Sequence, residues 1–370
     1  MIKLTRQNLR TPGPTPVPDD IMDSMSNPMI NHRGPEFLDL ISRVTEQLKQ
    51  VFMTQNDLFI LTSSGTGALE AAIVNTLSPG DKVLSATAGS FGDRFIDMAV
   101  AFGADVERLE FEWGQAVDPD AIRRALADSP AIKAVMVTHN ETSTGVTHPL
   151  KEIAAIVKDE FGKLLLVDAV SSLGCIPLPV DGWNCDAVAT ASQKGFMIPP
   201  GLAFISFSAD AWNAQKTATM PRFYFDLESA RRYLERGQTP FTPNLTALYG
   251  LSKALDNLLQ EGLEDVYERH RRIANYTREG IKDLGLELLA WDEAFASDAV
   301  TAVKIPESMD GPKFMRLLRA EENVVLAGGQ GKLSDSIFRI GHLGYVSQED
   351  IEEVFEALKK VLPKVGFSAH

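Results

Sequence analysis

A chain of 370 residues with 44% hydrophobic and 23% charged residues has the composition of a soluble globular protein, long enough for one large and one smaller domain. Its net charge of −14 repels phosphate backbones and argues against nucleic acid, while its two cysteines and six histidines lack the spacing of a disulfide framework or metal site. Because the N-terminus has no signal-peptide core and no apolar run could span a bilayer, we expect a cytoplasmic protein with no metal and no membrane partner.

The first predicted element is an extended N-terminal arm, residues 1–18, because the prolines of "TPGPTPVP" restrict the backbone. Apolar residues at helical spacing then predict a helix over 36–52. From 57 to about 208, short apolar strands alternate with helical patterns, which is typical of a mainly parallel sheet covered on both faces. The strands are expected in "DLFILTS", "KVLSAT", "DVERLEF", "AIKAVMVTH", "KLLLVDAV", "DAVATAS" and "GLAFISF". The predicted class is therefore α/β, with a doubly wound sheet.

The pattern changes after residue 208. Helical patterns come first, and short strands with two further helical patterns follow, which predicts a smaller α+β domain. The first three of these helices are expected at 226–236, 245–260 and 263–284. We place the boundary so that the large domain spans residues 19–261 and the small C-terminal domain spans residues 262–370.

Ligands of open α/β sheets bind outside the carboxyl ends of the strands, so the residues after each predicted strand are candidates for a site. Gly65 and Gly67, in "SGTG", open a helix and either bind an anion or form a tight turn. Phe91 follows the next strand and either stacks on a flat ring or begins a helix core. Thr142, in "NETSTG", either binds a ligand or belongs to a turn or helix cap.

Two charged residues stand where apolar strands end: Asp168 after "LLLV" and Lys194 after "DAVATASQ". A desolvated lysine has a lowered pKa and becomes a nucleophile toward aldehydes. An aspartate can pair with a protonated pyridine nitrogen. A lone buried lysine is usually structural, with its charged end reaching solvent. Together with the "SGTG" loop and Phe91 at neighbouring strand ends, however, the pair predicts a pyridoxal 5′-phosphate site.

Six motifs, in order, resemble the class V aminotransferase family of fold type I, closest to the alanine–glyoxylate and serine–glyoxylate (serine–pyruvate) aminotransferases. They are "TSSGTGALEAAI", "HNETSTG", "LLLVDAVSSLG", "ASQKGFMIPPG", "TPFTPNLTALYGL" and "FRIGHLG". The resemblance covers nearly the whole chain. It implies a pyridoxal-phosphate enzyme with a large cofactor-binding domain and a small C-terminal domain.

The resemblance also implies roles for individual residues. Lys194 resembles the lysine that bonds covalently to the cofactor, and Asp168 resembles the partner of the pyridine nitrogen. Phe91 stands at the ring-stacking position. Arg339, in "FRIG", is similar to the arginine that grips the substrate carboxylate, although the sequence alone would equally allow a surface strand residue. The implied contacts of the phosphate and the ring are Ser64, Gly65, Thr66, Thr142, Val170 and Gln193.

The segment "TPFTPN" bears on quaternary structure. Its Thr239 and Thr242 resemble residues that reach the phosphate of the neighbouring subunit, which implies a homodimer with shared active sites. The implied activity is ping-pong transamination between a small amino acid, alanine or serine, and a small 2-oxo acid, glyoxylate or pyruvate.

Other functions remain as alternatives. The chain could be an aminoethylphosphonate or ureidoglycine aminotransferase, or an accessory subunit that keeps the fold. A lyase of the cysteine desulfurase type is disfavoured, because Cys175 and Cys185 both precede Lys194, whereas that chemistry needs a thiol on a loop well after it. A dinucleotide oxidoreductase is disfavoured because its glycine fingerprint is incomplete.

Overall fold

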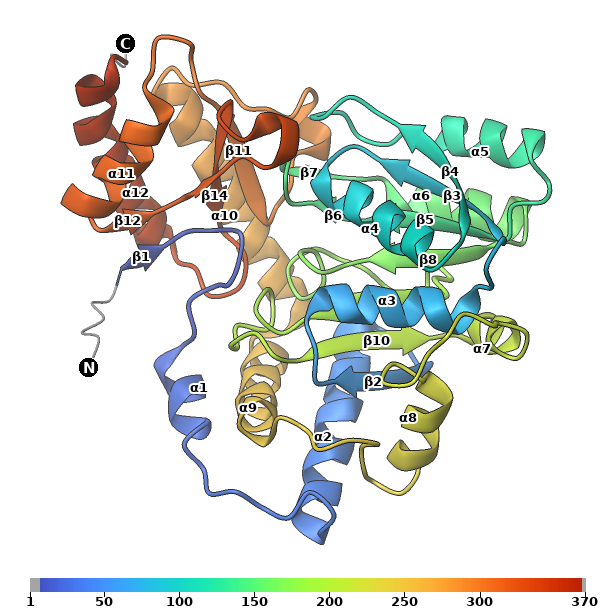
Figure 1. Cartoon of the computed structure of the whole chain (residues 1–370). Helices are drawn as coiled ribbons and strands as arrows, with labels where there is room; N and C mark the ends of the chain where they lie inside the picture. Colours follow the sequence, from blue (N-terminus) through green and yellow to red (C-terminus); the bar gives the residue numbers. More distant parts are fainter. Residues whose placement is uncertain (1–6, 368–370) are drawn as a thin grey trace.

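The computed structural model describes residues 7–367, and a seven-stranded sheet forms its centre (Figure 1). The strand order is β2-β10-β9-β8-β5-β3-β4, and only β10 runs antiparallel to its neighbours. The strands are β2 (Asp57–Leu61), β3 (Lys82–Thr87), β4 (Asp105–Glu110), β5 (Ala134–Thr138), β8 (Leu164–Asp168), β9 (Ala187–Ala191) and β10 (Ala203–Phe207). The predicted α/β class with a mainly parallel sheet is confirmed.

Helices cover both faces of this sheet, because alternate residues of each strand point to opposite sides. In β5, for example, Val135 and Val137 belong to one apolar core while Ala134 and Met136 belong to the other. The first core is closed by α1 (Asp19–Ser24), α2 (Pro35–Phe52), α5 (Pro119–Asp128), α6 (Leu150–Ala154) with its π-helical continuation η1 (Ala155–Glu160), and α9 (Leu245–Glu261). The second is closed by α3 (Gly65–Thr76), α4 (Ser90–Ala101), α7 (Ala209–Gln215) and α8 (Leu227–Leu234).

A separate apolar core lies under a three-stranded antiparallel sheet of order β11-β14-β13. Its strands and helices are β11 (Val300–Lys304), β13 (Ala327–Gly328), β14 (Ile337–Gly341), α10 (Leu263–Asp283), α11 (Gly311–Glu321) and α12 (Gln348–Val361). Three short helical turns also occur: η2 (Glu293–Phe295), η3 (Gly331–Leu333) and η4 (Leu362–Val365). The domain boundary at 262 stays a prediction; Gly262 lies between α9 and α10, with φ 89°.

The N-terminal arm links the two sheets. β1 (Asn8–Leu9) pairs in parallel with β12 (Val324–Val325), and the Arg10 carbonyl accepts a 2.7 Å hydrogen bond from the Gly341 amide. Further along, the Thr15 amide donates to the Gln193 carbonyl at 3.1 Å. These bonds lead the arm from the small sheet to the turn after β9. Its dark blue trace runs from β1 to α1 in Figure 1. Residues 1–6 of the predicted arm lie outside the described residues. Across residues 7–367, every helix is too short or too polar to cross a membrane.

Candidate active site

A cavity of about 330 Å³ opens at the carboxyl edge of the large sheet, between the first turns of α3 and α4 and the turn after β9. This is the edge at which open α/β sheets bind ligands. The lining residues are Gly13, Pro14, Ser64, Gly65, Thr66, Leu69, Phe91, Arg94, Asp168, Val170, Gln193, Lys194 and Pro200. The structure thus brings most of the residues singled out in the sequence to one cavity.

One end of the cavity is the beginning of α3. Ser64 is the N-cap in an extended conformation, and Gly65 is the first helical residue. The first amide groups of a helix have no partners within it and attract anions. A Cβ at Gly65 would lie 2.8 Å from Val170 Cγ2, so only glycine lets this helix start approach the strand ends so closely. The arrangement suits a phosphate group.

Lys194 lies in the turn after β9 and is 8% exposed. Burial, followed by the nearby positive charge of Arg339, lowers the pKa of its amine to about 8, against the opposing effect of Asp168. Its Nζ donates a hydrogen bond to the carbonyl of Pro12 in the N-terminal arm. A Cβ on Gly13 would lie 2.7 Å from this Nζ, so the arm closes directly over the amine. The lowered pKa increases the fraction of this enclosed amine that is neutral, which is the form that reacts with an aldehyde.

Asp168 is the last residue of β8 and is buried. Its Oδ1 accepts a 2.9 Å hydrogen bond from the Val170 amide. Burial raises the pKa of the carboxyl to about 7; the charge of Glu141 adds to this, and those of Lys194 and Arg94 oppose it. No ion pair or second hydrogen bond to the Asp168 carboxyl occurs within the described chain. A buried carboxylate with so few partners favours a cationic or protonated ligand group.

Phe91 is the second residue of α4 and half-buried at the cavity wall. The guanidinium carbon of Arg94, one helical turn later, lies 4.9 Å from the centroid of its ring. The Phe91 amide donates to the carboxylate of Glu141 at 3.1 Å. The ring is therefore held at the cavity by its helix and can stack on a flat ligand.

Arg339 reaches the site from the small sheet, although it does not line the 330 Å³ cavity. Its Nε donates to the Gly328 carbonyl at 2.9 Å and its Nη1 to the Thr142 carbonyl at 3.1 Å. The residue is 5% exposed, and no carboxylate of residues 7–367 pairs with it. Burial lowers the pKa of the guanidinium to about 10, with the charge of Glu141 opposing. Such an uncompensated cation favours an anionic ligand.

Thr142 is buried beside the cavity but does not line it. Its hydroxyl donates to Ser171 Oγ at 2.7 Å, so its contacts are with protein groups. Thr239 and Thr242 lie in the loop between α8 and α9, outside the cavity. The Thr239 hydroxyl donates to the Phe241 carbonyl, and Thr242 is exposed. A single copy of the chain does not bring these two threonines to the site.

Three features of the site were missed in the sequence. The arm at Pro12–Pro14 covers Lys194, and its "PGP" triplet could have been examined for a close approach. Arg94 lines the cavity one turn after Phe91, a spacing that places both on one helix face. Glu141, in the motif "HNETSTG", is a fully buried acid, and an acid between hydroxyl residues after an apolar strand is the signal that indicates it.

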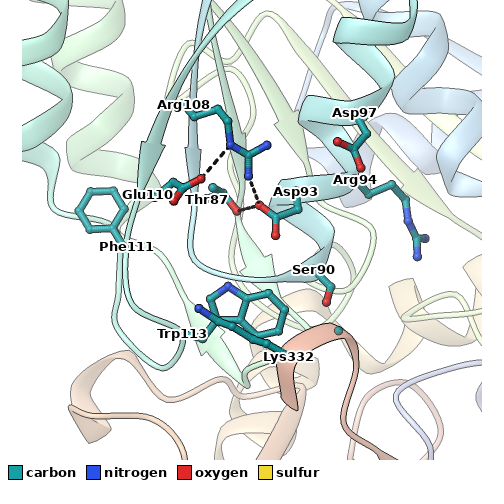
Figure 2. A pocket seen from close by; sticks show the side chains of 11 residues that line it. Thr87, Ser90, Asp93, Arg94, Asp97, Arg108, Glu110, Phe111, Trp113 and Lys332 are labelled. Atoms are coloured by element: carbon teal, nitrogen blue, oxygen red, sulfur yellow. Dashed lines mark hydrogen bonds and ion pairs between the residues drawn. The ribbon is translucent and has the colours of Figure 1, made fainter. Parts of the chain in front are cut away.

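A second cleft, of about 430 Å³, lies beside the first turns of α4 (Figure 2). Its lining residues are Thr87, Ser90, Asp93, Arg94, Asp97, Arg108, Glu110, Phe111, Trp113, Gly331 and Lys332. Figure 2 shows Arg108 bonded to both Asp93 and Glu110, at 2.8 and 2.9 Å. The Lys332 ammonium lies 4.8 Å from the centroid of the Trp113 ring. Arg108, Asp93 and Glu110 therefore compensate one another within the protein.

The first cavity has the groups that pyridoxal phosphate requires. The start of α3 can take the phosphate, Asp168 the pyridine nitrogen, and Lys194 the aldehyde carbon, while Phe91 can cover the ring. In addition, Gln193 Oε1 is buried at this cavity and accepts no hydrogen bond from residues 7–367. An orphaned acceptor at a cavity wall is expected to meet a ligand.

Comparison with known proteins agrees with the groups found in this cavity. A family model described as aminotransferase class-V matches residues 9–354. The soluble hydrogenase 42 kDa subunit of Anabaena cylindrica is 45% identical over 360 residues, which cover 97% of this chain and 94% of that protein. Serine–glyoxylate aminotransferase of Methylorubrum extorquens is 40% identical, covering 93% and 88%.

Among solved structures, alanine–glyoxylate aminotransferase from Nostoc sp. has a TM-score of 0.93 and 32% identity, and the match covers 98% of this chain and 96% of that one. A family match over almost the whole chain therefore coincides with a cavity at the carboxyl edge of the sheet whose lining residues fit pyridoxal phosphate. The protein belongs to the class V aminotransferases, enzymes of fold type I that depend on pyridoxal phosphate.

Proposed function

We propose that this aminotransferase moves an amino group between alanine or serine and a small 2-oxo acid, glyoxylate first and pyruvate second. The observation that carries the proposal is Arg339, a buried guanidinium without a carboxylate partner among the described residues. A guanidinium binds one carboxylate through two parallel hydrogen bonds. The other arginine at the cavity, Arg94, lies over the Phe91 ring, and its charge opposes the rise in the pKa of Asp168 that burial causes. Both of these residues face the cofactor in the proposed arrangement. The site therefore offers one arginine, Arg339, which suits a substrate with one carboxylate.

The bound cofactor supplies an aldehyde for the amino group and a ring that withdraws electrons from the α-carbon. Lys194 would hold the cofactor covalently and would move the proton of the α-carbon as a general base, for which a pKa near 8 is suited. Asp168 would hold the protonated pyridine nitrogen by a charge-assisted hydrogen bond. Arg339 orients the substrate, and the Pro12–Pro14 segment excludes water from the amine.

The chain's relatives support glyoxylate as the acceptor, because the names of two of the compared proteins include it. A small donor pocket discriminates poorly between alanine and serine, which differ by one hydroxyl. We expect both donors to work, within about 10²-fold of each other in kcat/KM.

The test is a half-reaction panel with the purified, cofactor-loaded protein. Each amino acid is added alone, and the change in the visible absorption band is followed. Alanine and serine should convert the band fastest. If aspartate, glutamate, ureidoglycine or aminoethylphosphonate outpaces them, the substrate proposal fails while the aminotransferase class stands. A lyase is disfavoured because Cys175 and Cys185 are buried, and burial raises the pKa of Cys175 to about 11.

We also propose a homodimer with shared active sites. Beside Thr239 and Thr242, Phe223 is 82% exposed, and the Tyr224 ring stacks on Phe241 at a centroid distance of 4.8 Å. Exposed aromatic residues of this kind favour a protein interface. The test is the mass in solution together with the activity of Thr242→Ala. An active monomer at assay concentration would contradict the proposal. A cytoplasmic location likewise stays a proposal, for which cell fractionation is the test.

An accessory role alongside catalysis is the alternative raised by the relative from Anabaena cylindrica, which is named as a hydrogenase subunit. It predicts that the chain purifies from its own cells in a complex larger than a homodimer. Size-exclusion chromatography of the native extract, followed by detection of this chain, separates the two possibilities.

A further inference from the structure

Glu141 is a fully buried acid for which the proposed reaction gives no role. It belongs to the short hairpin of β6 (Asn140–Glu141) and β7 (Val146–Thr147). Its carboxylate accepts hydrogen bonds from four donors: the amides of Phe91, Gly92 and Ser143 at 3.1, 3.0 and 3.0 Å and the Ser143 hydroxyl at 2.5 Å. No cation of residues 7–367 forms an ion pair with it. Burial raises the pKa of the Glu141 carboxyl, whereas these donors favour its ionised form.

The carboxylate caps the helix that carries Phe91. The N-cap residue of α4 is Gly89, which has no side chain to cap the helix. A Cβ at Gly89 would lie 2.4 Å from Glu141 Cδ, so glycine leaves the space that the carboxylate occupies. Ser143 completes the cap, since its hydroxyl accepts a 2.9 Å hydrogen bond from the Ser90 amide. A negative charge at a helix start is also favoured by the helix dipole.

The neighbouring residue, Thr142, connects the same segment to the substrate end of the site. Its carbonyl accepts the hydrogen bond from Arg339 Nη1. Its hydroxyl bonds Ser171, three residues after Asp168 in the chain. Three consecutive residues, 141–143, therefore hold the helix of Phe91 on one side and Arg339 on the other.

We propose that Glu141 is a positioning residue: its carboxylate fixes the first turn of α4, and with it the Phe91 ring, relative to the Thr142 carbonyl that holds Arg339. The inference rests on the proposed function, in which Phe91 covers the cofactor ring and Arg339 binds the substrate. Replacing one carboxylate oxygen by an amide group takes the acceptor away either from the Phe91 and Gly92 amides, which bond Oε2, or from the Ser143 amide and hydroxyl, which bond Oε1. In both cases the first turn of α4 is held less firmly, and with it the Phe91 ring.

The first experiment compares Glu141→Gln with Asp186→Asn, a matched control. Asp186 is also fully buried and bonded to an amide and a hydroxyl, but it lies before β9, at the opposite edge of the sheet. Apoprotein of each variant is titrated with pyridoxal phosphate, and the circular dichroism of the bound cofactor's visible band is recorded. Glu141→Gln should bind pyridoxal phosphate about 10-fold more weakly and change the dichroism. Asp186→Asn should stay within about two-fold of the parent protein.

The second experiment asks whether Glu141 acts through Phe91. In a double-mutant cycle with Phe91→Leu, the two effects on the dissociation constant of pyridoxal phosphate should not add. The double variant should bind about as weakly as the weaker single variant. Additive effects, or parent-like affinity and dichroism in Glu141→Gln, would overturn the proposal.

Folding is checked by the thermal unfolding of each apoprotein. If Glu141→Gln does not fold, Ser143→Ala serves instead, because it removes one donor from the carboxylate and one acceptor from the Ser90 amide. We then expect a smaller loss of affinity, about three-fold, and its absence would overturn the proposal. These readouts do not depend on turnover. If the parent protein binds pyridoxal phosphate but transfers no amino group, the proposed function is refuted. The affinities of the variants for pyridoxal phosphate still test the role of Glu141.

Discussion

Asp168 and Asp186 begin the same tripeptide, Asp-Ala-Val, and lie at opposite ends of the neighbouring parallel strands β8 and β9. Both are buried. The Asp186 carboxylate accepts hydrogen bonds from Lys158 Nζ at 2.7 Å, Ser208 Oγ at 2.7 Å and the Leu165 amide at 2.8 Å. The Asp168 carboxyl accepts one from the Val170 amide within the part of the chain that the structure describes. Burial alone therefore does not distinguish the candidate catalytic acid; incomplete compensation does.

Lys158, beside Asp186, and Lys194, in the cavity with Asp168, differ in the same way as the two aspartates. Burial opposes the charge of Lys158, but the hydrogen bond and charge of Asp186 outweigh it and raise the pKa of the amine. Lys194 has no ion pair with Asp168, and its pKa falls to about 8. One edge of the sheet thus carries an ion pair, and the other carries a lysine and an aspartate that form no ion pair within the described residues.

Replacing the lysines should give the largest contrast. Lys194→Ala should lose at least about 10⁴-fold in kcat, because it removes both the covalent attachment and the general base. Lys158→Ala should keep turnover within a few-fold but lose about 3 kcal/mol of stability, since it leaves Asp186 buried and unpaired. Borohydride reduction and peptide mapping should place the cofactor on Lys194. A reduced adduct in the same cavity of Lys194→Ala would remove Lys194 from the proposed role.

The aspartates should differ next. Asp168→Asn should fold but lose about 10²–10³-fold in turnover, because an amide cannot hold the pyridinium proton. Asp186→Asn should lose stability, by about 3 kcal/mol, and keep turnover. Steady-state kinetics and denaturant unfolding of both variants measure the two effects. Near-parental turnover in Asp168→Asn would show that Asp168 has no role in the reaction.

Two buried arginines, Arg339 on β14 and Arg278 on α10, extend the contrast to the three-stranded sheet and its helices. Arg339→Ala should raise KM for donor and acceptor alike by about 10²-fold, because both present a carboxylate to the same guanidinium. Arg278 on α10 is equally buried but lies 3.4 Å from Asp298 in an ion pair. Arg278→Ala should therefore lower stability and leave KM unchanged. If Arg339→Ala changes KM for neither substrate, Arg339 is not the carboxylate site.

The smallest effect concerns pH. Because the pKa of Lys194 in the apoprotein is lowered to about 8, its neutral fraction rises as pH rises through 8 and levels off above about 9. Borohydride-trapped incorporation of pyridoxal phosphate at Lys194 should rise about 30-fold between pH 6.5 and 9. Lys158, whose pKa is raised, should stay unlabelled over this range. Labelling of Lys194 that does not change with pH would contradict the lowered pKa.

The α/β class and the mainly parallel sheet could be predicted, because apolar strands and helical periods are written locally in the chain. The cavity residues after β2, β3, β8 and β9 could also be singled out. Parallel strands bring their carboxyl ends to one edge of the sheet. That Ser64, Phe91, Asp168 and Lys194 lie together can therefore be predicted without knowing the long-range contacts. The sequence places Asp168 after an apolar strand and Asp186 before one, but it does not show that only the Asp186 carboxylate has an ion-pair partner.

The sequence by itself determined the fold class and the strand-end residues that share the cavity. Only the tertiary structure decided which charges are compensated and what closes the site. The Pro12 carbonyl meets Lys194 across 182 residues, Arg339 meets Thr142 across 197, and Glu141 meets Phe91 across 50. Such contacts follow from how the arm, the small sheet and the β6–β7 hairpin pack together. No local period or turn encodes them, because hydrogen bonds between distant segments depend on geometry that exists only after folding.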